Sequence, residues 1–133
     1  METRIRNLSA AVCVLLVGCA GSVRAGRFMS PAELLSESGR LSGEYVKVEG
    51  WMESGFERYR IWTNEDAMVA GESVRDCIGL GIPASMESDR FDGSYVMVEG
   101  IFVSELPKST LVTGGCRNRA RIYLSANPVP VER

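Results

Sequence analysis

A twelve-residue segment that occurs twice in this chain of 133 residues restricts its fold more than any other feature. Residues 41–52 (LSGEYVKVEGWM) align with residues 91–102 (FDGSYVMVEGIF) at an offset of 50, and six of the twelve positions are identical. The valines alternate with other residues, as in a strand that buries one face. A single duplication with different segments between the copies does not fit a solenoid. The repeat therefore predicts two strands with equivalent positions in one domain.

Glycines occur at matching positions of both copies. Gly43 and Gly93 precede the strands and predict a turn before each. Gly50 and Gly100 lie inside the strands, where glycine permits a bulge or a sharp bend. A strand that bends in this way can serve both halves of a small barrel. Similar patterns predict five strands in all, over residues 44–52, 56–63, 77–82, 94–103 and 117–126.

A short helix is predicted before the first strand. Ser30 is followed by Pro31, which suits the first helical position, and by Glu33, which completes a capping box. Gly39 is the predicted end of this helix. Later in the chain, residues 64–76 predict a long loop with one helical turn, and residues 84–90 predict a second short helix.

The glycine-bounded V-x-V-x-G strands, followed by three strands around a short helix, resemble the OB fold. That fold is a five-stranded, partly open barrel, and the resemblance implies that its first and fourth strands lie side by side. The predicted fold class is therefore all-β with short helices: a five-stranded OB-like barrel over residues 28–133, preceded by the short capped helix. An SH3-like barrel is the alternative.

The amino terminus has the pattern of an export signal. Arg4 and Arg6 precede an apolar run over residues 8–18, which is too short to span a bilayer as a helix. Residues 16–19 (LVGC) resemble the lipobox of bacterial lipoproteins. The resemblance implies a signal peptide over residues 1–18, acylation of Cys19, and a lipidated tether over residues 19–27. Residue 20 is not Asp, which implies the periplasmic face of the outer membrane. An ordinary secretory cut after Ala25 is the alternative.

The mature chain also resembles small bacterial lipoproteins and exported proteins of uncharacterised function. The shared features are the capped helix, the paired V-x-V-x-G strands, a Cys-Ile-x-Leu strand at residues 77–80, and a Gly-Gly pair at residues 114–115 before an arginine-bearing strand. This resemblance implies a fold and a compartment, and it assigns no activity.

The four cysteines separate into three groups. The lipobox resemblance implies that Cys13 leaves with the signal peptide and that Cys19 is acylated. Cys77 and Cys116 remain in the exported domain, where disulfides persist, and we predict that they form one. The alternative is two separate buried thiols.

Composition excludes several classes of function. The chain contains no histidine, so it has no Ser-His or Cys-His nucleophile pair and no His-ligated zinc. The net charge of −2 lacks the basic excess that nucleic-acid-binding proteins usually show. No spacing suggests a metal site or a bound cofactor. The prediction is a protein that is not an enzyme.

Two groups of residues are candidates for binding. Arg117, Arg119 and Arg121 alternate along the last predicted strand, so one face could present three guanidinium groups to a phosphate or carboxylate. The alternative is a solvated face or a charged, protected edge. Trp51, Arg60 and Trp62 lie in the first two strands, where OB-fold proteins stack ligands. The alternative is that the aromatic rings fill the core.

These observations predict a membrane-anchored extracytoplasmic lipoprotein that acts as a non-enzymatic binding or adaptor module of the cell envelope. Its expected partners are the membrane, through the acyl chains, and an envelope protein or an anionic glycan. One alternative is a structural accessory subunit of an envelope complex. Another is a hydrolase that uses Glu49 and Glu99, the equivalent carboxylates of the repeat.

Overall fold

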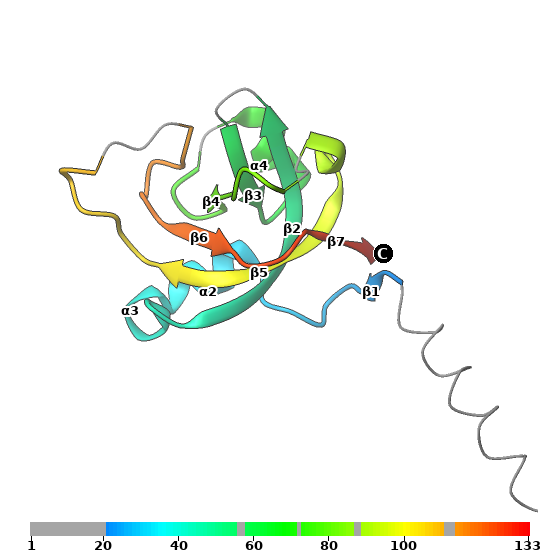
Figure 1. Cartoon of the computed structure of the whole chain (residues 1–133), viewed down its shortest axis with the longest axis horizontal. Coiled ribbons are helices and arrows are strands. Elements are labelled where there is room, and N and C mark those ends of the chain that lie inside the picture. Colours follow the sequence, from blue (N-terminus) through cyan, green and yellow to red (C-terminus); the bar gives the residue numbers. More distant parts are fainter. Residues whose placement is uncertain (1–20, 56–57, 72, 87–88, 111–113) are drawn as a thin grey trace, which may run out of the picture.

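The chain folds into a closed β-barrel (Figure 1). The computed structural model describes residues 21–55, 58–71, 73–86, 89–110 and 114–133. Neighbouring strands around the barrel follow the order β2–β3–β4–β6–β5, and β5 closes the barrel on β2. All these pairs are antiparallel except β4 with β6. The barrel strands are β2 (Tyr45–Gly55), β3 (Arg58–Trp62), β4 (Cys77–Gly81), β5 (Tyr95–Val103) and β6 (Arg121–Leu124).

The predicted fold class is confirmed. This strand order is that of an all-β, OB-like barrel, in which the first and fourth barrel strands are neighbours. The two copies of the sequence repeat supply these strands, β2 and β5, and they pair over seven residues.

The two copies are related by a local two-fold axis. Val48 lies opposite Val98, its equivalent in the repeat, so the axis passes between these two residues. The backbone hydrogen bonds at the strand ends are reciprocal. The Gly43 amide donates to the carbonyl of Phe102 at 2.7 Å, and the Gly93 amide donates to that of Met52 at 2.8 Å. Gly43 and Gly93 have φ values of 88° and 74°, which explains why both turns need glycine.

The interior glycines lie where each strand changes partner. β2 pairs with β5 up to Trp51 and with β3 from Trp51 onward, and Gly50 lies at this change. Gly100 lies at the equivalent change of β5 from β2 to β6. The predicted bend therefore has a specific cause. A third strand crosses so closely that a side chain at either position would collide with its backbone.

The barrel encloses the main hydrophobic core. One face of β2 and β5 fills it with valines, and α2 (Pro31–Ser36) adds Leu34, which is fully buried. A second, smaller cluster lies on the outside of the barrel, where Trp62, Cys77 and Cys116 are buried against Ala67 and Met68 of α4 (Glu65–Ala70). The outer surface of β3 and β4 is thus covered and ordered, unlike a solvated sheet face.

The helix before the barrel begins as predicted. The Ser30 hydroxyl accepts a hydrogen bond from the Glu33 amide at 3.1 Å, and the capping box is complete. The prediction that Gly39 ends the helix is wrong. α2 ends at Ser36, and a separate turn, α3 (Ser38–Leu41), contains Gly39. The helical turn predicted within residues 64–76 is α4. The short helix predicted over residues 84–90 is wrong in its bounds, since residues 84–86 form a turn and a bend and the three-residue η1 spans Asp89–Phe91.

Two short strands were not predicted from the sequence. β1 (Val23–Arg24) pairs in parallel with β7 (Val129–Glu132), which itself pairs with β5. Residues 23–24, expected in a free tether, are therefore part of the sheet. The first 20 residues, including Cys13 and Cys19, lie outside the described part of the chain. In the described residues, no helix is long and apolar enough to cross a membrane.

Candidate functional site

A pocket of about 180 Å³ lies on the outside of β3 and β4. In an OB-like barrel these are the second and third strands, the face on which such folds bind their ligands together with the loop between the fourth and fifth strands. That loop, between β5 and β6, also contributes to the pocket here. The lining residues are Arg60, Trp62, Gly71, Ser73, Cys77, Gly115, Cys116 and Arg117.

Three of the predicted binding residues meet in this pocket. Arg60 and Trp62 come from β3, and Arg117 comes from the loop before β6, 55 positions after Trp62. Two larger pockets of about 370 and 360 Å³ lie elsewhere, one beside Arg90 and Phe91 and one beside Leu35 and Val74. Neither contains a predicted site residue, so the β3–β4 pocket is the stronger candidate.

Glu53 orients the pocket side chains of β3. It lies opposite Arg60 in the strand pairing, and its Oε1 accepts from Arg60 Nε at 2.6 Å. The same oxygen accepts from the indole Nε1 of Trp62 at 3.2 Å. The Arg60 guanidinium carbon lies 5.4 Å from the centre of the Trp62 ring, within the range of a cation–π contact. Glu53 therefore holds a cation and an aromatic ring in one fixed arrangement.

The predicted disulfide between Cys77 and Cys116 is present. Its two Cα atoms are 5.9 Å apart, and it joins β4 to the loop that carries Arg117. Trp62, which has no exposed surface, packs against both half-cystines. The bridge therefore places Arg117 at the pocket formed by β3, which sequence separation alone would not predict.

Hydrogen bonds to backbone groups hold the remaining walls in place. The Ser73 hydroxyl accepts from the amides of Arg75 and Asp76, at 3.1 and 2.9 Å. The Asn118 side chain donates to the carbonyls of Cys77 and Val74, at 2.7 and 3.0 Å. Sequence reasoning missed Glu53, Ser73 and Asn118. Glu53 could have been found from the sequence, because it can lie opposite Arg60 when the first two strands form a hairpin. The sequence contains no comparable signal for Ser73 and Asn118, which act through contacts of loops.

The expectation of three arginines on one strand face is wrong. β6 begins at Arg121, and Arg119 has a left-handed backbone with φ of 61°, which breaks the alternation. The Arg119 guanidinium instead donates to the carbonyls of Leu106, Pro107 and Thr110, so it closes the preceding loop.

Arg121 lies beside Gly79 of β4, and its Nη1 contacts the Leu80 carbonyl at 3.4 Å. Its Nε is buried and has no hydrogen-bond partner among the described residues. Of the three arginines, only Arg117 lines the pocket.

Trp51, another predicted binding residue, lies next to the pocket and does not line it. It is opposite Trp62 in the pairing of β2 with β3 and is half-buried. Its ring meets the edge of the Tyr95 ring with centres 5.4 Å apart. The Arg133 guanidinium carbon lies 5.2 Å from the Trp51 ring centre and 4.5 Å from that of Tyr95.

Glu49 and Glu99 do not face each other as a carboxylate pair. The register sets Glu49 opposite Met97 and Glu99 opposite Lys47. Each glutamate instead accepts a hydrogen bond from the tyrosine of the other copy of the repeat, as the local two-fold axis requires. Tyr95 donates to Glu49 at 3.2 Å, and Tyr45 donates to Glu99 at 2.5 Å. These two equivalent contacts explain why the tyrosine and the glutamate are identical in both copies of the repeat.

Both tyrosines are perturbed by these contacts. Burial, followed by the charge of Glu49, raises the pKa of Tyr95 above its ordinary value of 10.0. The hydrogen bond to Glu99 is the largest cause that raises the pKa of Tyr45. Glu49 is itself buried, and its second oxygen has no partner among the described residues, whereas the first also accepts from the Gly26 amide at 2.6 Å.

The strand order and the pocket define the class of protein as an OB-like barrel with a small pocket on its β3–β4 face. No protein-family model, curated protein or solved structure matches the chain. Within the described ranges, no group of three cysteine, aspartate or glutamate side chains is arranged to hold a metal ion.

Proposed function

We propose that this protein is a lipid-anchored, extracytoplasmic binding module, and that its β3–β4 pocket binds an anionic group of a cell-envelope glycan or protein. The observation that carries the proposal is the convergence of Arg60, Trp62 and Arg117 on the face that OB folds use for ligands. The location rests on the lipobox-like residues 16–19.

The chemistry of the pocket suits binding of a negatively charged group. Arg117 is exposed, and a guanidinium can donate two parallel hydrogen bonds to a carboxylate or phosphate. Arg60 is mostly buried and paired with Glu53, and the fully buried Trp62 ring packs against it and supports its position. Among the described lining residues, Ser73 carries a hydroxyl, which accepts from the amides of Arg75 and Asp76 and contacts the Asp76 Oδ2 at 3.3 Å. The arrangement therefore supports binding of an anionic group.

The pairing of β1 favours processing before Cys19. A cut after Ala25 would remove β1 and the hydrogen bond from the Ala25 amide to the Glu132 carbonyl, at 2.9 Å. A cut before Cys19 keeps both contacts. The residues that the barrel uses therefore begin soon after the proposed acylated cysteine.

Titration of the purified protein tests the binding proposal. Soluble peptidoglycan fragments with free carboxylates and phosphorylated lipopolysaccharide core oligosaccharide are the two probes, and tryptophan fluorescence is the readout. We expect saturable binding of one probe, and Arg117→Ala should weaken it at least about tenfold, since a charge-assisted hydrogen bond contributes about 1.5–3 kcal/mol.

Arg40→Ala is the matched control, because Arg40 is exposed on α3 and, within the described part of the chain, its guanidinium pairs with Glu37 at the start of that helix. Equal loss of binding in both variants would contradict the assignment of the pocket. Absence of binding to either probe, with the protein recovered in a stable complex, would instead support the structural accessory subunit.

A further inference from the structure

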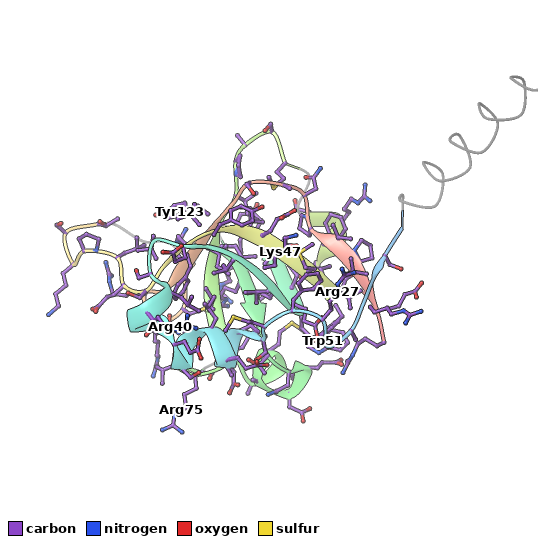
Figure 2. All side chains as sticks on the ribbon, turned by 90° about the horizontal axis from the view of Figure 1, so that it is seen from below. Arg27, Arg40, Lys47, Trp51, Arg75 and Tyr123 are labelled. Carbon is purple, nitrogen blue, oxygen red and sulfur yellow. A yellow bond between two sulfur atoms is a disulfide. The ribbon has the colours of Figure 1, made fainter. Side chains whose placement is uncertain are left out.

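The side of the barrel from which β1 leaves carries a cluster of cations and aromatic rings, here called the basic patch. Its members are Arg24, Arg27, Phe28, Lys47, Trp51, Tyr95 and Arg133. Figure 2 shows Arg27, Lys47 and Trp51 on this side, whereas Arg40 and Arg75 lie away from it. The patch is separate from the β3–β4 pocket, whose lining shares no residue with it.

Cation–π contacts arrange the basic patch in two groups, one around Phe28 and one around Trp51 and Tyr95. The guanidinium carbon of Arg27 and the Nζ of Lys47 lie 5.8 and 6.0 Å from the centre of the Phe28 ring. Lys47 and Trp51 project from the same outer face of β2, with Glu49 between them. Arg133 lies over the rings of Trp51 and Tyr95 at the other end.

The charge of the patch is opposite to that of the rest of the molecule. Residues 19–133 contain 13 Lys and Arg and 16 Asp and Glu, because Arg4, Arg6 and Glu2 precede them, so their net charge is −3. The patch has four cations. Three carboxylates lie close to it: Glu49 is buried, Glu99 accepts from Tyr45 and lies opposite Lys47 in the strand pairing, and Glu132 is exposed beside Arg24. The four cations exceed these three carboxylates by one.

The short chain between the proposed anchor, Cys19, and the barrel determines which surface the basic patch contacts. Four residue steps separate Cys19 from Val23, the first residue of β1. An extended chain of that length reaches at most about 14 Å. If Cys19 carries acyl chains, the barrel is held against the membrane, and the side that bears β1 faces the lipid headgroups.

We infer that the basic patch docks the barrel on an anionic lipid surface, with Arg27 and Lys47 at the headgroups and Trp51 at the interface. This inference rests on the lipid anchor of the proposed function. Cations within a few ångströms of anionic lipids attract the surface, and tryptophan is suited to the boundary between headgroups and acyl chains. Such docking would fix one orientation of the barrel relative to the membrane.

Fluorescence quenching tests the orientation. The acylated full-length protein is reconstituted into vesicles of phosphatidylcholine alone or with phosphatidylglycerol, both containing lipids brominated near the headgroup end of the acyl chain. We expect stronger tryptophan quenching with phosphatidylglycerol. This extra quenching should disappear in Trp51→Phe, because the remaining tryptophan, Trp62, is fully buried.

Charge reversal tests the cause. Arg27→Glu with Lys47→Glu should abolish the extra quenching, since loss of each cation lowers the docking equilibrium constant about fivefold and loss of both lowers it at least about 25-fold. The control, Arg40→Glu with Arg75→Glu, should retain it. Equal quenching in neutral and anionic vesicles, or an unchanged signal in the first pair, would overturn the inference. An unacylated protein, detected by its intact mass, would instead show that the proposed anchor has failed.

Discussion

Alanine at Gly100 should open the barrel where β5 meets β6. A Cβ at this position would lie 2.7 Å from the carbonyl carbon of Tyr123 and 3.0 Å from the Cα of Leu124, and closer still to the Tyr123 oxygen. Ordinary contacts of a Cβ begin at 3.4 Å, so the β6 backbone must move by about 0.7 Å or more. The neighbouring atoms are backbone, and no rotation of a side chain can relieve the collision.

The expected cost follows from these distances. Overpacking of a core against movable side chains costs about 1–3 kcal/mol, and a shift of a paired strand adds weakened hydrogen bonds of about 1 kcal/mol each. We expect Gly100→Ala to lower the free energy of unfolding by at least about 3 kcal/mol. Gly50→Ala should act in the same direction with a smaller effect, because its closest contact is the Trp62 oxygen at 2.5 Å.

Urea unfolding followed by near-ultraviolet circular dichroism measures this cost. At an m-value of about 2 kcal/mol per molar urea, the Gly100 variant should unfold at least about 1.5 M earlier than the wild type. Gly55→Ala is the control, since a Cβ there meets nothing within 4 Å, and it should shift stability by no more than about 0.5 kcal/mol. A Gly100 variant as stable as the Gly55 variant would refute the explanation of the repeat glycines.

Three further perturbations have clear expected outcomes. Cys19→Ser should leave an unprocessed or soluble protein without acyl chains, and a variant that still fractionates with membranes at mature size would contradict the lipoprotein assignment. Alkylation without reduction should modify neither Cys77 nor Cys116, and replacing both with alanine should cost about 4 kcal/mol, as expected for a link 39 residues apart. The free energy of unfolding should fall as the pH rises above 10.0, because the raised pKa of Tyr95 means that the folded state holds the proton after the unfolded chain has lost it. Tyr95→Phe should reduce that fall in urea titrations at about pH 9 and about pH 11, and an identical fall in the variant would argue against the burial of Tyr95 beside Glu49 as its cause.

The barrel was predictable because its key features are local in the sequence. The glycines that are identical in both copies of the repeat either turn the chain, as Gly43 and Gly93 do, or allow a close strand crossing, as Gly50 and Gly100 do. The capping residues Ser30 and Glu33 act within one helical turn. Patterns of this kind can be read without knowledge of the partner strand.

The predictions from the sequence were wrong where contacts between residues far apart in the chain override the local alternation of residues. Arginines alternate over residues 117–121, but three carbonyl groups of the preceding loop capture Arg119 and turn its backbone out of the extended region. β1 and β7 are short, and β7 contains Pro130, which argues against a strand in any reading of sequence alone.

The sequence predicted which types of residue form the candidate site, but it did not predict which of the candidate residues share one pocket. Arg60, Trp62 and Arg117 were all candidates, yet only the disulfide and the barrel closure show that they share a pocket. Trp51 and Arg121, which were equally plausible from strand position, lie outside its lining.

The most direct test of the central claim is site-specific photocrosslinking in intact cells. A photoreactive residue at Ser73, which lines the pocket and is half-buried, samples the site. We expect an envelope glycan or protein to be captured there and identified by mass spectrometry. Arg117→Ala should remove the adduct, and the same probe at Arg40 should capture nothing comparable. An adduct at Ser73 that persists unchanged in Arg117→Ala would refute binding at this pocket.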